Sequence, residues 1–467
     1  MNEKAEHLRR LLSRRGIPVA AIRDLLLAEF ASQPAITEIC QRIDELEEKV
    51  IRDWEEKLRI ADLAAAPVAL ANGMVGREYS AEIRWGALDA YLGEHHSLNQ
   101  IIPGLHYDPL ARRLTGTPSE AGEFDLILEF SIAGSTTGQR GTKSVKVIIN
   151  HDPKSLWKNA PSDCHDRYWQ EDEASSGVRF GKHLVLAASK RGRSHAHEGK
   201  FRDDSFRIEY FDDHDWGIVA VSDGAGSSKY SRKGAALACE AVASHFRSFS
   251  SEQWATLDRT VEAYLSERSD TNRASLNEIL PVLMISAARD ACDAIYHEAR
   301  SASAEVRDYS CTLLFALSKQ FSSHFTVVSF WVGDGGIGLY QESSGEIHLL
   351  GEPDSGEYAG ETRFLTTPDV LSGQRVRFKA VENFTALVLM TDGVSDPKFQ
   401  TDANLKSPPV WKDLWNEIGE FGANAKENQP PWEPEEGKTA LLEWLDFWSP
   451  GNHDDRTIAI IYPGAQS

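Results

Sequence analysis

The stretch WGIVAVSDG at residues 216–224 decides the fold, because it joins an apolar run of strand length to an Asp-Gly pair. The same combination recurs in FTVVSFWVGDG at residues 325–335 and in FTALVLMTDG at residues 384–393. A single Asp-Gly pair after a strand is usually a turn, since both residues suit turn geometry. Three such pairs, each after a long apolar run, instead predict buried strands that deliver three carboxylates to one end of a sheet. The carboxylates belong to Asp223, Asp334 and Asp392.

Two acidic pairs elsewhere in the chain could join these carboxylates. FRDDSF contains Asp203 and Asp204, and GNHDDRTIAII contains Asp454 and Asp455, each at the start of an expected strand. Carboxylates gathered in a buried place repel one another unless cations neutralise them. Hard divalent ions prefer such oxygen ligands, and a pair of them can lower the pKa of a bound water and clamp an oxyanion leaving group. Since no GxSxG, CxxxxxR or Walker motif competes, the pattern indicates metal-assisted phosphoester hydrolysis.

The composition is that of a soluble globular protein, with 41% hydrophobic and 26% charged residues among 467. This length predicts two or three domains. The net charge of −21 disfavours nucleic-acid binding, which needs clustered Lys and Arg. Five scattered cysteines without CxxC spacing disfavour a disulfide framework and a zinc site. The charged start MNEKAEHLRR and the lack of a long apolar run predict neither signal peptide nor membrane span, and therefore a cytoplasmic protein.

Residues 1–63 are expected to form a helical N-terminal segment. In the second half of this segment, apolar side chains recur every three or four residues among charged ones. They are Ile39, Ile43, Leu46, Val50, Trp54 and Leu58. Two interpretations stay open: a helical arm that packs on its own protein, or a coiled-coil contact with a partner, for which the stripe is short.

Residues 66–152 change to short strand-like runs separated by turn signals, which predicts a small antiparallel sandwich. The stretch IIPGLHYDPLARRLTGTPSEAGEFDLILEFSI resembles the second half of bacterial cadherin-type immunoglobulin-like domains, and NGMVGREYSAEI resembles their opening strands. The resemblance implies a binding or spacer role for this domain. Residues 153–182, polar and aromatic with little periodicity, are expected to form a linker.

Residues 183–467 are expected to form an α+β domain, with helices at about residues 232–248 and 276–301 between apolar strand-like runs. In chain order, RDDSF, VSDGAG, YSCTLL, VGDGGIGLY, TDGVSD and DDRTIAI resemble motifs of the metal-dependent type 2C (PPM-type) serine/threonine protein phosphatases, especially their bacterial branch. RSHAHEGKFRDDSF and GEYAGETRFLTT resemble further segments of that branch. The resemblance spans about residues 183–462 and implies a phosphatase β-sandwich flanked by helices.

The resemblance also implies a set of metal ligands. Asp223 would bridge two Mn²⁺ or Mg²⁺ ions, Asp392 and Asp454 would hold the second ion, and Asp334 with Asp392 would form an optional third site. A water that bridges the metals would attack the phosphorus of phosphoserine or phosphothreonine. Asp223, Asp392 and Asp454 are therefore the predicted catalytic residues.

Other residues receive supporting roles from the same resemblance. The Gly224 carbonyl would bind one ion, and Asp204, alone or with Asp203, would contact the ions directly or through water. Ser310 and Thr312 of YSCTLL would be structural.

Two positions depart from the family pattern. Asp455 stands where many relatives have asparagine, and Gly199 stands where many relatives have an arginine that grips the substrate phosphate. Several nearby residues could replace that arginine. For His195, a structural, hydrogen-bonded role is an equally good interpretation. The candidates are Arg193, His195, Lys200 and Arg202.

A tryptophan-rich insertion is expected at about residues 398–450, with helices at about residues 410–421 and 438–448 beside a Pro-rich loop. It could be a hydrophobic cap packed on the sandwich, or a flap that selects substrates beside the metals. Its tryptophans are Trp411, Trp415, Trp432, Trp444 and Trp448.

Together these patterns predict a metal-dependent phosphatase whose partners are phosphorylated proteins and a cognate protein kinase, with docking through the N-terminal modules. One alternative is a catalytically weak, phosphatase-like adaptor that binds a phosphoprotein or kinase. Another is a hydrolase of small phosphoesters, which no nucleotide-cradling glycine loop supports.

Overall fold

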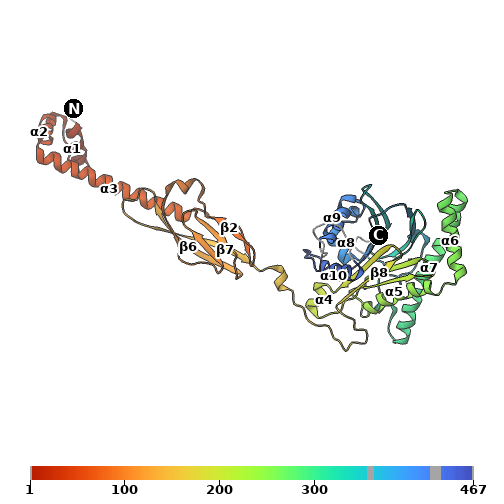
Figure 1. The fold of residues 1–467 in the computed structure, drawn as a ribbon. Helices are drawn as coiled ribbons and strands as arrows, with labels where there is room; N and C mark the ends of the chain where they lie inside the picture. The colour runs from red at the N-terminus through yellow and green to blue at the C-terminus, as the bar shows by residue number, and fades with distance from the viewer. Residues whose placement is uncertain (1–2, 355–361, 421–432, 465–467) are drawn as a thin grey trace. The chain divides into compact units, whose positions relative to one another are not determined.

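The computed structural model describes residues 3–354, 362–420 and 433–464, and the chain divides into two compact units, Met1–Leu156 and Trp157–Ser467. The N-terminal helices and the sheet-rich segments expected from the sequence are present (Figure 1). Within the described residues, no helix combines the length and the apolar character needed to cross a membrane.

Three helices open the first unit: α1 (Glu3–Arg14), α2 (Asp24–Ala31) and the long α3 (Pro34–Ala65). Pro34 suits the first turn of α3, because an N–H at that position would have no partner inside the helix. The three helices share a small core around Leu8 and Leu27.

The last turns of α3 pack on a β-rich module with two sheets, in the orders β1-β7-β6-β3 and β2-β5-β4. The Glu56 carboxylate accepts hydrogen bonds from Ser135 and Thr137, and Leu63 joins the module's core. The strands are β1 (Gly73–Met74), β2 (Tyr79–Glu82), β3 (Leu92–Leu98), β4 (Leu105–Asp108), β5 (Arg113–Gly116), β6 (Gly122–Ile132) and β7 (Gly141–Asn150). Burial alternates along β6, as the alternation of FDLILEFSI predicts. The immunoglobulin-like assignment stays a prediction.

Two antiparallel sheets form the centre of the second unit. Their strand orders are β10-β11-β12-β13-β16 and β15-β14-β17-β18-β9-β8. The five-stranded sheet consists of β10 (Ser205–Phe211), β11 (Trp216–Ser222), β12 (Leu313–Gln320), β13 (Phe325–Val332) and β16 (Val376–Val381). The six-stranded sheet consists of β8 (Glu173–Phe180), β9 (His183–Lys190), β14 (Gly336–Gln341), β15 (Glu346–Gly351), β17 (Ala386–Met390) and β18 (Arg456–Pro463).

The central strands of both sheets are apolar on both of their faces. One face of each sheet therefore packs against the other sheet, and the opposite face packs against helices. Val219 and Val221 of β11 meet Leu387 and Leu389 of β17 in the core between the sheets. Ala220, the residue between the two valines, points outward into a second core with the helices, as does Ile218. Buried strands of this kind read as continuous apolar runs, which is how the sequence presents them.

Helices cover the outer face of each sheet, on opposite sides of the strands in Figure 1. The five-stranded sheet carries α5 (Ser231–Arg247), α6 (Ser251–Ser266) and α7 (Asp270–Ser301). The six-stranded sheet carries α8 (Asp392–Phe399), α9 (Pro408–Gly419) and α10 (Pro434–Trp444), and Trp411 and Trp444 are fully buried against it. The predicted α+β sandwich flanked by helices is therefore confirmed. Trp432 lies outside the described residues.

The differences from the sequence expectation include one strand and one long helix. Residues 173–180 fall in the expected linker but form the edge strand β8, which the alternation signal missed because an edge strand can be largely polar. Helix α6 was not expected, although Ser250 and Gln253 form a capping box at its start and Trp254, Leu257 and Val261 face the core.

Candidate metal centre

The three Asp-Gly pairs meet at one edge of the sandwich. Asp223 follows β11, Asp334 follows β13, and Asp392 begins α8 directly after β17, so both sheets contribute. One carboxylate oxygen of each residue lies within 4.8 Å of those of the other two, and all three side chains are half-buried. The structure thus brings together three of the predicted metal ligands.

The glycine of each pair lets another site segment come close. A Cβ on Gly224 would lie 2.5 Å from the Asp203 carbonyl oxygen. A Cβ on Gly335 would lie 2.4 Å from the Met390 carbonyl oxygen, and one on Gly393 would lie 1.8 Å from the Asp455 carbonyl oxygen. Real Cβ atoms do not approach backbone this closely, so the Asp-Gly pattern here reflects backbone packing as well as turn geometry.

Asp204 lies immediately before β10 and is fully buried. Its Oδ2 accepts a hydrogen bond from the Thr391 hydroxyl at 2.9 Å, which ties it to the residue before Asp392. On the other side, the Asp223 N–H donates to Thr312 Oγ1 at 2.9 Å and the Thr312 N–H donates back to the Asp223 carbonyl at 2.8 Å. Thr312 therefore fixes the backbone that carries Asp223.

The carboxylates resist ionisation in the absence of cations. Burial raises the pKa of Asp223 well above its ordinary value, and the charges of Asp392 and Asp204 raise it further. Burial is also the largest cause of the raised pKa of Asp392, followed by the charges of Asp334 and Asp454. For Asp204, burial and then the charge of Asp455 raise the pKa to about 7.

Unpartnered oxygens provide a test of whether divalent cations fit this centre. Among the described residues, no hydrogen-bond donor reaches the buried Oδ1 atoms of Asp204, Asp334 and Asp392. The second oxygen of Asp334 does accept a bond, from the Thr362 hydroxyl. Buried acceptors are normally paired, and carboxylate oxygens are the ligands that Mg²⁺ and Mn²⁺ prefer. The donor set therefore fits such an ion.

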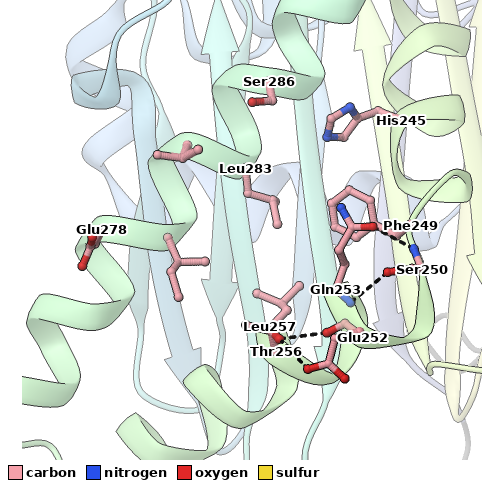
Figure 2. A pocket seen from close by; sticks show the side chains of 12 residues that line it. His245, Phe249, Ser250, Glu252, Gln253, Thr256, Leu257, Glu278, Leu283 and Ser286 are labelled. Carbon is pink, nitrogen blue, oxygen red and sulfur yellow. Dashed lines mark hydrogen bonds between the residues drawn. The ribbon is translucent and has the colours of Figure 1, made fainter.

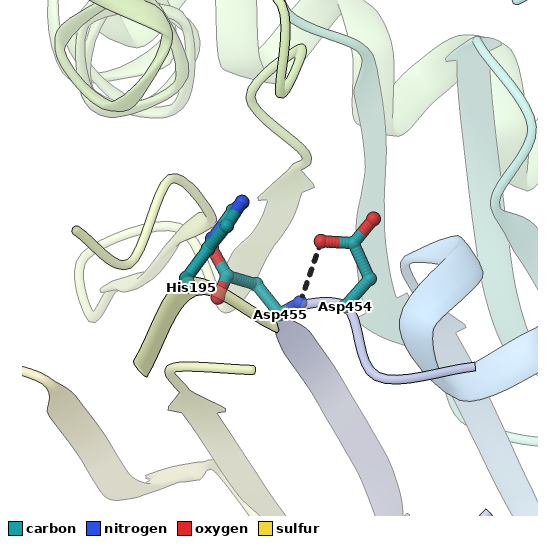
Figure 3. A group of neighbouring side chains, drawn as sticks. All are labelled: His195, Asp454 and Asp455. Carbon is teal, nitrogen blue, oxygen red and sulfur yellow. Dashed lines mark hydrogen bonds and ion pairs between the residues drawn. The ribbon is translucent and has the colours of Figure 1, made fainter. Parts of the chain in front are cut away.

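The predicted ligand Asp454 belongs to a second cluster, which it forms with His195 and Asp455 (Figure 3). Asp455 Oδ2 lies 3.0 Å from His195 Nδ1 and also accepts from the Asp203 N–H, while Oδ1 accepts from the Gly192 N–H at 2.6 Å. The Asp455 N–H in turn donates to Asp454 Oδ1 at 2.8 Å. Asp455 thus links three chain segments, a role that its place beside the predicted ligand Asp454 did not reveal.

His195 is held as a cation by this arrangement. Burial lowers the pKa of its imidazole, but the hydrogen bond and charge of Asp455 outweigh burial and raise the pKa to about 9. The other ring nitrogen, Nε2, lies 3.9 Å from where a Cβ on Gly226 would stand, in the loop after Asp223. His195 therefore bridges the Asp455 cluster and the loop that carries Asp223.

The candidate phosphate-binding residues are engaged elsewhere in the structure. Arg193 donates to the Phe447 carbonyl and to Asp446, near the end of α10. Arg202 is buried and donates to Ser189 and to the Asp204 carbonyl. Lys200 pairs with Glu198. Phosphate gripping by one of these residues stays a prediction.

One further pair positions the Asp334 turn and was missed from the sequence. Arg375 donates to both carboxylate oxygens of Asp354, at 2.6 and 2.8 Å. Asp354 accepts in turn from the N–H of Gly333, whose φ of 118° favours glycine. Asp354 precedes residues 355–361, which lie outside the described residues and contain the first half of GEYAGETRFLTT.

A separate hollow of about 670 Å³ lies between the end of α5, α6 and α7 (Figure 2). Its apolar lining comes from Phe249, Leu257 and Leu283, with Glu252 and Glu278 among its polar residues. None of its lining residues belongs to the carboxylate centre. The hollow is therefore distinct from the candidate metal centre.

The sequence profile of the family described as protein phosphatase 2C matches residues 191–446, more than half of the chain. The serine/threonine-protein phosphatase 3 of Escherichia coli (strain K12) is 26% identical over 246 residues, which cover 52% of this chain and 82% of that protein. Among solved structures, the catalytic domain of serine threonine protein phosphatase PstP in complex with 2 manganese ions shares 15% identity, with a TM-score of 0.35 over 62% of this chain and 99% of that chain. For serine/threonine phosphatase Stp1 from Staphylococcus aureus the identity is 13% and the TM-score 0.34, over 60% and 94% of the two chains.

Proposed function

Because the chain belongs to the protein phosphatase 2C family, we propose that it hydrolyses phosphoserine and phosphothreonine in proteins with the help of Mn²⁺ or Mg²⁺. The observation that carries the proposal is the meeting of Asp223, Asp334 and Asp392 from both sheets, with buried carboxylate oxygens left unpartnered among the described residues. This arrangement is unfavourable without cations and matches their ligand preference.

In this proposal Asp223, Asp392 and Asp454 are the catalytic residues, and Asp204, Asp334 and the Gly224 carbonyl complete the ligand set. Bound divalent ions would supply a water of lowered pKa and positive charge against the phosphoryl oxygens. Thr391 orients the Asp204 carboxylate through its hydrogen bond, and Thr312 holds the backbone that carries Asp223.

The hydrogen bonds of Asp455 hold chain segments next to the proposed centre in place. Its bonds to the backbone of Gly192 and Asp203 fix the approach of Asp204, and its bond to His195 holds a cationic imidazole beside Asp454. Such fixed dipoles and charges stabilise a developing negative charge without reorganising during the reaction. We place His195 in a positioning role.

The test is the hydrolysis of a phosphothreonine peptide by the purified protein with and without Mn²⁺, for the natural sequence and for Asp223→Asn. Asp212→Asn, which changes an exposed aspartate outside the centre, is the matched control. Turnover that requires Mn²⁺, survives in the control and is lost in Asp223→Asn supports the proposal. Full turnover in Asp223→Asn would show that the assignment is wrong, and no turnover by folded protein would favour the adaptor alternative.

Phosphorylated proteins are the substrate class that serine/threonine phosphatase activity implies. An opposing protein kinase, and docking of either partner through residues 1–152, are further parts of the proposal. They rest on the presence of a separate N-terminal unit. Deleting those residues should leave peptide turnover intact and weaken only the binding of protein partners, measured by calorimetry.

A further inference from the structure

Helix α3 exposes large apolar side chains along one face. The exposed fractions of Leu46, Val50 and Trp54 are 58%, 67% and 59%, and Ile39 and Leu58 are also exposed. Soluble proteins rarely leave a continuous apolar strip of this kind uncovered, because its contact with water is unfavourable. The strip, defined here as residues 39–58, extends over roughly 30 Å of helix.

The strip borders the contacts that α3 makes inside its own unit, but its side chains from Leu46 to Leu58 are not covered by them. Glu56 and Leu63 lie on another side of the helix and contact the β-rich module. Asp44 and Glu47 form ion pairs with α1, and the side chain of Ile36 packs under α1 and α2. The strip thus remains uncovered even though both ends of α3 are attached.

The order of side chains along the strip is that of a two-stranded coiled coil. Ile43 and Val50 fall at positions a of a heptad frame, and Ile39 and Leu46 fall at positions d. Beta-branched residues at a with leucine at d favour two parallel helices. The frame ends where Asp53 would take the next d position, and Trp54 continues the apolar strip one residue later, as in a local change of helical register.

The charges beside the strip fit a second copy of the same helix. In this frame Arg42 is at position g and Glu47 at position e, the two positions that face each other across a parallel pair. Glu47 uses Oε1 to accept from Arg14 of its own chain at 2.7 Å. Its other carboxylate oxygen can accept from Arg42 of the second copy.

We propose that α3 pairs in parallel with α3 of a second copy of this chain, so that the strip becomes the seam of a homodimer. Four seam positions are few for a coiled coil, so the dimer is expected to be reversible in the micromolar range. The pairing would hold two phosphatase units on one stem.

The test measures the mass of the full chain in solution by light scattering over a range of concentrations. In Leu46→Glu/Val50→Glu, like charges would meet across the seam, and the mass is expected to stay at that of one chain. Glu45→Gln is the control, because Glu45 lies about 140° around the helix from Val50. Circular dichroism and peptide turnover show whether each variant has folded.

The natural sequence is expected to show a twofold rise in mass that the control shares and the double variant lacks. In a background with Cys40→Ser and Cys164→Ser, oxidised Ile39→Cys is expected to crosslink to its counterpart, since parallel helices place equivalent residues together. A mass of one chain at every concentration would overturn the proposal and indicate another cover for the strip. So would a dimer that persists in the double variant, or crosslinking between Ile39→Cys and Leu58→Cys in place of Ile39→Cys with itself.

Discussion

The carboxylate centre and the α3 strip are opposite departures from the usual distribution of side chains. The centre places charged groups inside the protein, where Asp204 is fully buried. The strip places hydrocarbon outside it, where Val50 is mostly exposed. Each arrangement is unfavourable on its own, and each proposal supplies a partner that would make it favourable: a divalent cation for the centre, an apolar helix for the strip. Buried carboxylates therefore indicate a cationic partner, and exposed apolar side chains indicate an apolar partner.

The comparison is tested most strongly by Asp392→Asn. Removing a proposed ligand is expected to lower Mn²⁺-dependent peptide turnover by about a thousandfold, since metal-held charge contributes several kcal/mol to such reactions. In metal-free protein the same change removes a source of repulsion, so the free energy of unfolding is expected to rise by about 1 kcal/mol. Turnover assays and urea unfolding in EDTA measure the two effects. Unfolding at lower urea than the natural sequence would show that the centre is not strained.

Gly393→Ala is expected to destabilise the second unit by about 3 kcal/mol and to abolish turnover, because the new Cβ would overlap the Asp455 carbonyl oxygen. Gly373→Ala is the control, since the atom nearest to its Cβ would lie at 3.4 Å, an ordinary contact. Thermal unfolding of both variants gives the comparison. Equal melting temperatures for Gly393→Ala and Gly373→Ala would mean that the backbone around Asp455 can shift to accommodate the new Cβ at little cost.

Metal-free protein should lose stability as the pH rises from about 4 to 7. The pKa of Asp204 is raised to about 7 in the folded state, so the folded chain keeps a proton that the unfolded chain has already released. For this one group the loss is at most about 1.4 kcal/mol per pH unit. Urea unfolding in EDTA at several pH values measures it. Saturating Mn²⁺ should abolish the trend, and a trend that persists in its presence would argue against a metal beside Asp204.

The smallest effect is expected from Leu46→Glu/Val50→Glu on catalysis. These side chains are exposed, so turnover per chain and the unfolding of the second unit should change by less than about 0.5 kcal/mol in free-energy terms. Peptide assays below and above the dimerisation range provide the measurement. A clear change in turnover would show that the strip affects catalysis at the centre, so that the two regions do not act independently.

The sequence predicts those parts of the site that follow from strand ends. A strand ends where its apolar run ends, so the apolar runs and the Asp-Gly pairs that follow them predict where Asp223, Asp334 and Asp392 lie. The apolar runs also predicted the two-sheet core. Helix α6 also carries a signal that can be read from the sequence, the capping box of Ser250 and Gln253.

Contacts between distant segments could not be predicted in the same way. Asp455 and His195 lie 260 residues apart, and nothing in their local sequences shows that a carboxylate and an imidazole will meet at 3.0 Å. The Arg375–Asp354 pair is equally non-local. Such bonds depend on the packing of complete strands, and single-sequence patterns report only local preferences.

The position of β18 has a consequence for biosynthesis. This strand is the last of the described strands in chain order, yet it lies inside the six-stranded sheet, between β17 and β9. Asp454 and Asp455 immediately precede it. During translation the sheet therefore stays divided until β18 has left the ribosome and inserted between its neighbours. Until then a nascent chain lacks Asp454 and Asp455, so under the proposed function it could not hydrolyse phosphoproteins before its own synthesis has passed this point.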